Sequence, residues 1–283
     1  MSHGSSIISK VIDTPGEIRP RQHSALWHAA PEGWRDRLAQ AVERGLANHR
    51  PFIFFRADDI GAGGRAFEAI CELFRHHQVP LAMAVVPAWI SAIRKSQLFQ
   101  AAPLEEPLWG WHQHGWRHVN WQRTGIQSEF GEERPFEKQW RDIWQGKQKM
   151  SEIFGEHLVP VFTPPWNRLS NPTLRILQEL DFKAVSITGP LPRGSRPPTG
   201  LKNLRIQIDM HTRKSKEAEE DFHSLLEELV VHLARKEPGG IMIHHHYMTS
   251  FAFEFLDELL TLLKSQPQVH LAGFKEILNK RNE

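Results

Sequence analysis

Phe52-Ile-Phe-Phe-Arg-Ala-Asp-Asp59 is an apolar run that ends at two adjacent carboxylates, and the glycine-rich segment Ile60-Gly-Ala-Gly-Gly64 follows it directly. A short apolar run bounded by turn residues is typical of a buried strand, and the glycines indicate the loop at its C-terminal end. Ligands of parallel α/β proteins bind at such strand ends. Asp58 and Asp59 therefore predict a site, although adjacent acids after a strand are often only a solvated turn or a helix cap.

The composition limits the kind of protein this chain can be. It has 283 residues, of which 40% are apolar and 24% charged, so it can bury one large core. The formal net charge is only +2, with no block of like charges, which argues against nucleic acid and anionic membrane surfaces as partners. Small-molecule or neutral-polymer partners fit this charge better, and the composition leaves the oligomeric state open.

Two further features concern location and redox chemistry. The first ten residues lack a basic segment followed by a sustained apolar one, and no later apolar run approaches the length of about 18 residues that a membrane span needs. We therefore expect a cytosolic protein without a membrane span. The single cysteine, Cys71, excludes an internal disulfide, and its helical spacing indicates a packed core residue.

Strand and helix patterns alternate along the chain. Strands are predicted near residues 52–59, 79–87, 108–111, 158–162, 182–187, 204–208 and 239–243, and helices near 33–49, 65–77, 134–154, 171–180, 216–236 and 253–263, with residues 269–272 and a terminal helix after them. Such alternation is the signature of a parallel sheet. It predicts a single-domain α/β (β/α) barrel over residues 23–283, imperfect or open, with residues 1–22 as a loose lead-in.

A second motif, Trp109-Gly-Trp-His-Gln-His-Gly-Trp-Arg-His118, is rich in histidine. The spacing of His114 and His118 places two imidazoles on one side of a helical turn or tight loop, close enough to share a metal ion. Two histidines and one acid from a neighbouring strand end are a recurrent catalytic metal set. The alternative is a histidine-rich surface loop without metal, since 17 histidines make chance pairings frequent.

Taken together, these two motifs resemble the first two motifs of the polysaccharide deacetylases, carbohydrate esterase family four. Three later stretches are similar to the remaining motifs and follow in the same order: Phe162-Thr-Pro-Pro-Trp-Asn167, Ile206-Gln-Ile-Asp209 and Gly239-Gly-Ile-Met-Ile-His-His-His246. The resemblance covers about residues 50 to 247. It implies a distorted (β/α)7 barrel and metal-dependent removal of an acyl group, such as acetyl, from an N-acetylated sugar or a related amide.

The resemblance also implies roles for individual residues. Asp59, His114 and His118 would hold a divalent ion, with zinc preferred over cobalt, nickel or manganese. Such an ion polarises an amide carbonyl and lowers the pKa of bound water from about 15.7 towards 7. Asp58 would act as the base and His245 as the acid that protonates the leaving amine. Asp209 would fix the tautomer of that histidine, and His244 is the alternative acid.

The chain departs from the family pattern at three places. Thr163 occupies the position where the third motif usually begins with an arginine that pairs with the catalytic aspartate. Arg56 could replace it, because on an extended strand it points to the same side as Asp58; Arg168 is another candidate, and for either the alternative is a solvent-facing arginine. Gly115 stands where a hydroxyl is usual, and three consecutive histidines leave the fifth-motif histidine open. These departures suggest a diverged intracellular branch.

Aromatic and proline residues beside the motifs are candidates for binding substrate. Trp111, Trp116 and Trp166 could form flat walls for a sugar ring, although tryptophans more often pack in the core or at a rim. A backbone N–H near Pro165 and Trp166 could help to hold the oxyanion.

Two other functions compete with the deacetylase hypothesis. The missing third-motif arginine favours a metal-binding barrel that has lost catalysis and binds a ligand or partner. A metal-dependent hydrolase of an ester or phosphoester is the other, for which Gly61-Ala-Gly-Gly64 offers only a weak phosphate site.

Overall fold

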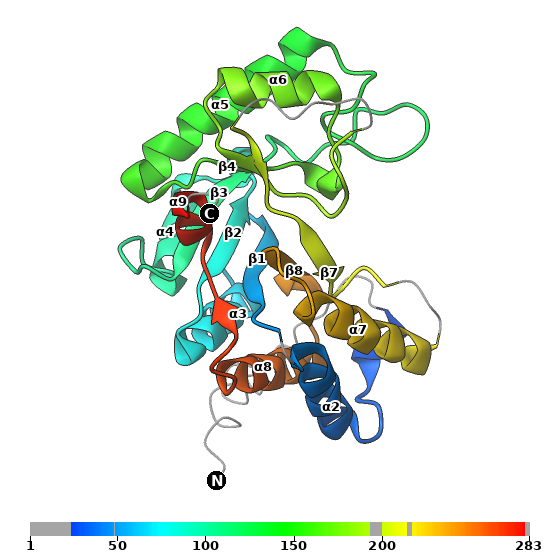
Figure 1. Ribbon diagram of the computed structural model, residues 1–283. Coiled ribbons are helices and arrows are strands. Elements are labelled where there is room, and N and C mark those ends of the chain that lie inside the picture. Colours follow the sequence, from blue (N-terminus) through cyan, green and yellow to red (C-terminus); the bar gives the residue numbers. More distant parts are fainter. Residues whose placement is uncertain (1–23, 48, 193–199, 214–216, 281–283) are drawn as a thin grey trace. The chain divides into compact units, whose positions relative to one another are not determined.

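The computed structural model describes residues 24–47, 49–192, 200–213 and 217–280 (Figure 1). The chain divides into two compact units, each built from segments that are separated in the sequence. Unit 1 comprises Met1–Phe55, Gly63–Pro80 and Gln207–Ala272, and unit 2 comprises Arg56–Ala62, Leu81–Ile206 and Gly273–Glu283. Strand β1 (Phe52–Ile60) runs from one unit into the other, so that Arg56, Asp58 and Asp59 belong to unit 2.

Unit 1 combines a small set of strands with longer helices. Its elements are η1 (Ala25–His28), α2 (Trp34–Leu46), the first part of β1, α3 (Arg65–His77), β7 (Ile206–Asp209), α7 (Ala218–Leu233), β8 (Gly239–Ile243), η5 (His245–Tyr247), α8 (Ser250–Lys264) and β9 (His270–Leu271). The strand order is β7-β8-β1, and β9 pairs with β1 in parallel, with Phe52 opposite His270.

Apolar residues at helical spacing form the core of unit 1. Helix α3 buries Phe67, Ile70, Cys71 and Phe74, which lie three or four positions apart on one face. The cysteine is therefore a core residue, as predicted. Helix α2 lies so close to α7 that a Cβ added to its Gly45 would approach a Leu233 side-chain atom to 2.8 Å.

Unit 2 holds most of the sheet. Its elements are the second part of β1, β2 (Leu81–Val85), η2 (Pro87–Trp89), α4 (Ala92–Ala101), β3 (Trp109–His114), α5 (Phe136–Phe154), η3 (Gly155–His157), β4 (Val161–Thr163), η4 (Pro165–Asn167), α6 (Asn171–Glu179), β5 (Ala184–Val185), β6 (Lys202–Asn203) and α9 (Phe274–Asn279). The strand order is β1-β2-β3-β4-β5-β6, and the neighbouring pairs from β2 to β6 are parallel.

The side chains of β3 alternate between two environments. Trp111 packs against Phe154 of α5, with ring centroids 4.8 Å apart, whereas His112 and His114 carry the polar chemistry described below. Because β3 and β4 are in register, His114 lies opposite Thr163. The last residue of a buried strand is thus a histidine whose backbone is fixed by its neighbour.

The strand order and the alternation with helices confirm the α/β class and the distorted (β/α)7 barrel predicted from the sequence. Among the described residues, no helix combines the length and the apolar character needed to cross a bilayer. The lead-in predicted at residues 1–22 lies outside the described residues. The assignment of residues 23–283 to one domain and the cytosolic location stay predictions.

Some boundaries differ from the sequence-based expectation. Helix α4 was not predicted, because Leu98 is its one buried core residue, so its sequence carries almost no apolar period. Strand β6, which was not predicted, is only two residues long and lies just before the strand predicted near residues 204–208. Strand β3 continues three residues beyond the predicted 108–111, and it therefore carries His114 itself.

Candidate active site

The end of β1 presents its two carboxylates differently. Asp58 is buried, with 2% of its surface exposed, and continues the extended strand. Asp59 has a positive φ of 61°, a conformation that is uncommon for residues other than glycine. Backbone strain of this kind is concentrated at functional sites, where the surrounding structure maintains it. Here it turns Asp59 away from the regular alternation of the strand.

Arg56 and Asp58 form a buried ion pair. The guanidinium donates from Nε to Oδ1 and from Nη2 to Oδ2 of the carboxylate, both at 2.7 Å. Arg56 has no exposed surface. A bidentate contact between arginine and a carboxylate is among the strongest charge-assisted hydrogen-bond arrangements, and it fixes the orientation of the carboxylate. The sequence placed both residues on the same side of the strand, and the structure shows them paired.

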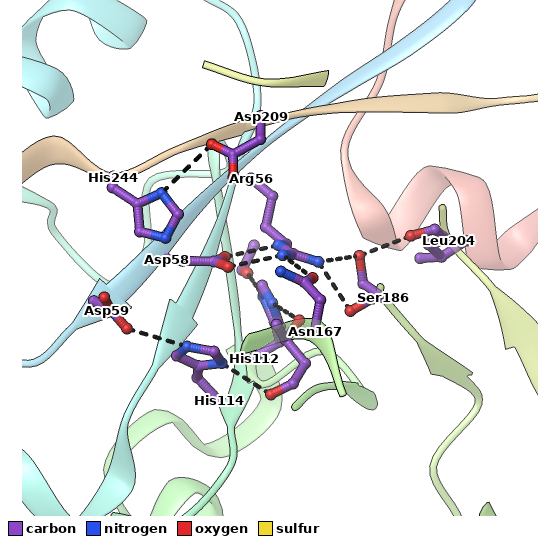
Figure 2. A network of polar contacts seen from close by, with 12 residues as sticks. Arg56, Asp58, Asp59, His112, His114, Asn167, Ser186, Leu204, Asp209 and His244 are labelled. Atoms are coloured by element: carbon purple, nitrogen blue, oxygen red, sulfur yellow. Dashed lines mark hydrogen bonds and ion pairs between the residues drawn. The ribbon is translucent and has the colours of Figure 1, made fainter. Parts of the chain in front are cut away.

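Three further contacts hold the guanidinium itself (Figure 2). Its Nη2 donates to Oδ1 of Asn167 at 2.7 Å, and its Nη1 donates to both the carbonyl and the hydroxyl oxygen of Ser186 at 2.9 and 2.8 Å. The Ser186 hydroxyl in turn donates to the carbonyl of Leu204. A buried charge is costly unless its donors find partners. The network supplies them, so the arginine is held in place by residues that are far apart in the sequence.

Asp59, His114 and His118 converge on one point. The Oδ1 atom of Asp59 lies 3.2 Å from Nε2 of His114 and 3.1 Å from Nε2 of His118. One ligand atom from each of the three residues lies within 4.8 Å of those from the other two. Atoms bound about 2.0–2.1 Å from a tetrahedral ion are themselves about 3.3 Å apart. The spacing of the three donors therefore fits a divalent ion.

The tautomer of His114 supports the same reading. Its Nδ1 lies 2.9 Å from the carbonyl oxygen of Thr163, which can only accept a hydrogen bond. The Nδ1–H therefore donates there, and Nε2 is the nitrogen directed at Asp59 (Figure 2). Metal-binding histidines commonly donate their second N–H to a carbonyl or a carboxylate in this way, which orients the ring.

The charges of this cluster are mutually dependent. Burial raises the pKa of Asp59, but the hydrogen bonds with His114 and His118 outweigh burial and hold this pKa well below its ordinary value. Burial lowers the pKa of His114, but the hydrogen bond to Asp59 and the nearby carboxylates raise it overall. The site thus favours an ionised acid facing a positive charge.

His112 is a buried neighbour of the cluster. It has no exposed surface, and its Nδ1 and Nε2 lie 3.0 Å from the carbonyl of Gly110 and from the hydroxyl of Thr163. Burial lowers the pKa of His112 to about 3, so the ring is neutral near neutral pH. Thr163, which stands where the third motif of the polysaccharide deacetylases usually begins with an arginine, thus contacts His112 and His114.

A buried acid organises the loop that carries His118. The Glu129 carboxylate accepts the backbone N–H groups of Trp116, Arg117 and His118 at 3.2, 2.8 and 3.2 Å. Burial raises the pKa of Glu129, while these three donors lower it, and the net shift is upward. His118 has a positive φ of 59°, so the loop adopts a conformation that needs support. Glu129 provides that support from outside the motif.

Gly115 is explained by the same loop. Its φ is +57°, and a Cβ at this position would approach a Glu129 carboxylate oxygen to 2.3 Å and a Pro165 ring carbon to 2.6 Å. No side chain fits there without displacing both neighbours. The hydroxyl that is usual after the first motif histidine is therefore absent because the space belongs to Glu129 and Pro165.

The aromatic candidates fall into two groups. Trp111 has no exposed surface and packs between Phe99 and Phe154, so the prediction that it walls a sugar site is wrong: the alternation of β3 turns it into the core. Trp166 is half-buried and its ring centroid lies 4.4 Å from that of His118. Trp116 is also half-buried, but it packs against the apolar core of unit 2.

The other arginine considered from the sequence lies elsewhere. The guanidinium of Arg168 donates to the carbonyl of Gln127 at 3.0 Å, on an exposed segment. This contact of Arg168 is to backbone, whereas the Arg56 guanidinium donates two hydrogen bonds to Asp58. Of the two candidates for the missing arginine, Arg56 is the one that the geometry favours.

Unit 1 contains the second group of predicted residues. Asp209, at the end of β7, accepts the backbone N–H groups of His211 and Thr212 at 3.0 and 3.2 Å and the Thr212 hydroxyl. Its Oδ1 lies 4.0 Å from Nδ1 of His244 (Figure 2). The aspartate therefore shapes a turn and lies near, but not within hydrogen-bond reach of, a histidine.

His245 begins the short helix η5. It is 6% exposed, and its ring makes an edge contact with Phe67 at 5.7 Å and with His246 at 5.4 Å. The preceding residue, His244, is tied through its backbone N–H to Nδ1 of His211 at 3.1 Å. The ion-pair contact of Asp209 with His244 favours the alternative acid considered from the sequence.

Several contributing residues were not identified from the sequence. Asn167 and Ser186 lie far along the chain from Arg56, and Glu129 lies in a polar segment without a period. Trp89, whose ring centroid is 5.7 Å from that of His118, follows a strand at the position of a short η2 helix. For Asn167 and Trp89, the sequence offers one signal of a role in the site: both follow a predicted strand, and ligands of parallel α/β proteins bind at strand ends.

No protein-family model matches the sequence, and no curated protein matches it. Solved structures with a similar fold do exist. A Mycobacterium smegmatis structure described as a polysaccharide deacetylase is 13% identical, covers 91% of this chain and 94% of its own, and has a TM-score of 0.56. A mutant of a Bacillus anthracis family-four pseudoenzyme, with restored enzymatic activity, is 14% identical over 82% and 68% of the two chains, with a TM-score of 0.51.

A family 4 acetyl xylan esterase from Clostridium thermocellum, in complex with a cobalt ion, is 12% identical over 80% of this chain and 89% of its own, with a TM-score of 0.50. At these identities the likeness concerns the fold. The resemblance first seen in five short motifs thus extends over most of the chain, which has the fold of the polysaccharide deacetylases.

Proposed function

We propose that this protein is a metal-dependent hydrolase that removes an acyl group, such as acetyl, from an N-acetylated sugar or a related amide. One observation carries the proposal: two consecutive acids have different partners. Asp58 is clamped by a buried guanidinium, while Asp59 converges with two imidazoles. A hydrolase of this kind needs one acid as a base and another as a metal ligand.

Asp59, His114 and His118 would hold the divalent ion, for which zinc is our first candidate, with cobalt, nickel and manganese as alternatives. When bound, such an ion supplies polarisation of the acyl carbonyl and lowers the pKa of water from about 15.7 towards 7. The two nitrogens and one oxygen are a ligand set that leaves open positions for water and substrate.

Asp58 is the proposed base that removes a proton from the attacking water. A carboxylate buried beside Arg56 remains ionised, since the neighbouring cation favours the charged form. The guanidinium is itself held by Asn167 and Ser186, so the carboxylate cannot rotate away from its position. Such preorganisation avoids the cost of reorienting the base during the reaction.

A proton must also reach the leaving amine, and unit 1 offers two histidines for this role. His245 matches the motif pattern best, whereas His244 is the one whose ring nitrogen lies near the Asp209 carboxylate. A nearby carboxylate stabilises the protonated imidazole and orients it. The proposal therefore keeps both as candidates for the acid and assigns Asp209 to orient it.

Substrate contacts are proposed for the residues around His118. Trp166 lies against this histidine and offers an aromatic face for a sugar ring. Trp166 has a positive φ of 55°. Such strained backbone conformations are concentrated at active sites and ligand-binding sites. We propose that an N–H of this segment helps to hold the oxyanion, with Trp116 supporting the wall.

The proposal is tested by metal analysis of the purified protein, followed by measurement of acetate release from a panel of N-acetylated sugars and oligomers. Each sample is assayed after chelation and after addition of zinc, cobalt, nickel or manganese. We expect one bound divalent ion and metal-dependent acetate release. Bound metal without turnover on any member of the panel would contradict catalysis and leave a metal-binding protein.

An ester is a second candidate bond. The acetyl xylan esterase among the structurally similar proteins favours it, and the same base and metal ligands would serve. An alcohol leaves more readily than an amine, so an esterase depends less on an acid. Including acetylated xylan in the panel distinguishes the two. Loss of catalysis is the third possibility, which the pseudoenzyme with the same fold illustrates.

A further inference from the structure

A basic groove lies in unit 2 beside the loop that carries His118. Its volume is about 1060 Å³. Five basic and two acidic side chains line it, although the formal net charge of the whole chain is only +2. The basic side chains exposed at the surface are Arg117, Arg123, Lys138 and Arg141. The basic side chains of the groove therefore outnumber its acids.

The two acids of the groove are occupied by other partners. The Glu133 carboxylate accepts the backbone N–H of Arg123 at 2.9 Å and the hydroxyl of Thr124 at 3.1 Å. Asp142 is buried and ion-paired with the guanidinium of Arg134, which is also buried. Arg141 also lies 3.8 Å from the Asp142 carboxylate. The exposed Arg117, Arg123 and Lys138 still outnumber Glu133, the exposed acid of the groove.

An aromatic ring lies among the cations. Trp121 is 46% exposed, and the Arg134 guanidinium lies 4.9 Å from the centroid of its ring. The flat face of a tryptophan packs well against the C–H face of a sugar. The groove thus offers both positive charge and an apolar platform, a combination suited to an anionic sugar more than to a bare ion.

The groove is connected to the proposed metal site by covalent and hydrogen bonds. Arg117 immediately precedes His118, and the backbone N–H groups of both donate to the Glu129 carboxylate. The Arg134 guanidinium donates to the backbone carbonyl of Glu129 at 3.2 Å. A ligand that binds in the groove is therefore held at a fixed position relative to the loop that carries the metal ligand.

We infer that this groove is a binding subsite for an anionic group, a phosphate or a carboxylate, carried by the sugar substrate. The inference rests on the proposed function, since it names the class of substrate for that same site. Trp121 stacks on a sugar ring, and Arg123 and Lys138 contact the anion. The preferred substrate is consequently an acidic N-acylated saccharide and not a neutral one.

Calorimetric titration of the metal-loaded full chain tests this directly, without any requirement for turnover. The probes are N-acetylglucosamine 1-phosphate, neutral N-acetylglucosamine, glucuronic acid and inorganic phosphate. Both the phosphorylated sugar and glucuronic acid are compared with the neutral sugar, so that the two anion types are distinguished. The double variant Arg123→Ala/Lys138→Ala removes two exposed groove cations. Lys95→Ala/Lys236→Ala removes two exposed cations outside the groove and is the matched control.

We expect at least one anionic sugar to bind about tenfold or more tightly than the neutral sugar, and its binding to weaken with rising salt. The groove variant should lose about tenfold in affinity, and the control should bind like the wild type. Equal binding of charged and neutral sugars, or an unchanged groove variant, would overturn the inference. Inorganic phosphate binding as tightly as the sugar phosphate would also overturn it, because the sugar would then contribute nothing.

The test separates this inference from the proposed function. If an anionic sugar binds in the groove but no acetate is released from any substrate, the subsite stands and the hydrolase proposal fails. If acetate is released equally well from neutral and anionic sugars and the groove variant is fully active, the hydrolase stands and the subsite is refuted.

Discussion

The two units hold their acidic residues in very different ways. In unit 2, Arg56 and Asp58 are almost completely buried and joined by two bonds of 2.7 Å. In unit 1, the Asp209 and His244 side chains are 23% and 13% exposed, and Oδ1 of Asp209 lies 4.0 Å from Nδ1 of His244. The proposed base Asp58 is thus held by direct hydrogen bonds, whereas the pair proposed for the acid is not.

The cause lies in what else each carboxylate binds. Asp58 has both oxygens engaged by one guanidinium, and that guanidinium is held by a further network. Asp209 has its oxygens engaged by the turn that follows it. Because the carboxylate oxygens of Asp209 already accept hydrogen bonds within this turn, they orient a histidine less firmly. The comparison therefore predicts strong, specific effects of substitution in unit 2 and graded effects in unit 1.

The largest expected effect is that of Asp58→Asn. Loss of a general base typically lowers the rate by about a hundred- to ten-thousand-fold, and added metal cannot replace a missing proton acceptor. We expect the variant to keep its metal and to be inactive. Metal content and acetate release, both measured with and without metal supplementation, test this prediction.

Asp59→Asn is the matched control at the neighbouring position. An amide oxygen can still coordinate a metal but carries no charge, so we expect weaker metal binding and partial rescue of activity by added metal. The roles are reversed if Asp58→Asn is the variant that loses metal. If neither substitution changes metal content or rate, the acids at the end of β1 are only a charged turn.

The contrast also shows which parts of the site a sequence can predict. Arg56 and Asp58 are two residues apart on one strand, so the two-residue period of a strand was enough to place them together. His114 and His118 share one loop, and their spacing was equally informative. Asn167 and Ser186 contact Arg56 from more than a hundred positions away, and no local period can indicate such a contact.

The fold was predictable for a related reason. Alternating buried strands and amphipathic helices repeat along the chain, and that pattern determines a parallel α/β arrangement. The misses were helix α4, which buries little, and the orientation of Trp111, whose strand was predicted three residues too short. Had the strand been extended to His114, alternation would have placed Trp111 on the opposite face from the histidines.

The second prediction concerns the acid in unit 1. If His245 protonates the leaving amine, His245→Ala should lose about a hundredfold or more in turnover of amides and much less with activated esters, whose leaving groups need no proton. His244→Ala is the parallel variant. Rates with both kinds of substrate decide between them, because the true acid shows the amide-selective loss.

Other outcomes would revise the comparison itself. Equal losses on amides and esters for one variant would indicate a structural role for that histidine. A selective loss for His244→Ala would assign the acid to the residue nearer to Asp209. If neither variant discriminates between the two substrates, unit 1 does not supply the acid at all.

The third prediction concerns Glu129, which stabilises the His118 loop in unit 2. Glu129→Gln replaces one acceptor oxygen by an NH2 group, and that group cannot accept any of the three backbone N–H groups now bound to the carboxylate. Substitution of a residue that orients a metal ligand typically lowers metal affinity by about 10- to 100-fold. We expect a loss in that range, measured by competition with a chelator of known affinity.

Glu137→Gln is the control for this experiment, because Glu137 is an exposed acid in the first turn of α5. It should bind metal like the wild type. A positioning role further predicts that saturating metal restores most of the turnover of Glu129→Gln, whereas a general loss of folding would not be restored. Unchanged metal affinity would show that the loop keeps its shape without the carboxylate.

The smallest expected effect concerns His232 of unit 1. Unlike His112, whose two ring nitrogens each have a hydrogen-bond partner, His232 has none among the described residues. Both ring nitrogens of His232 are buried without a hydrogen-bond partner among the described residues, and burial lowers its pKa to about 4. The unfolded chain binds this proton near pH 6.5, so the folded state loses stability as the pH falls from about 6.5 towards 4. Between pH 7 and pH 5 the loss in the free energy of unfolding attributable to His232 is about 2 kcal/mol.

Denaturant unfolding of His232→Leu should therefore show a pH dependence of stability that is smaller by that amount. The control His223→Leu, at an exposed site on the same helix, should keep the pH dependence of the wild type. A wild-type pH dependence in His232→Leu would mean that the ring is not buried neutral.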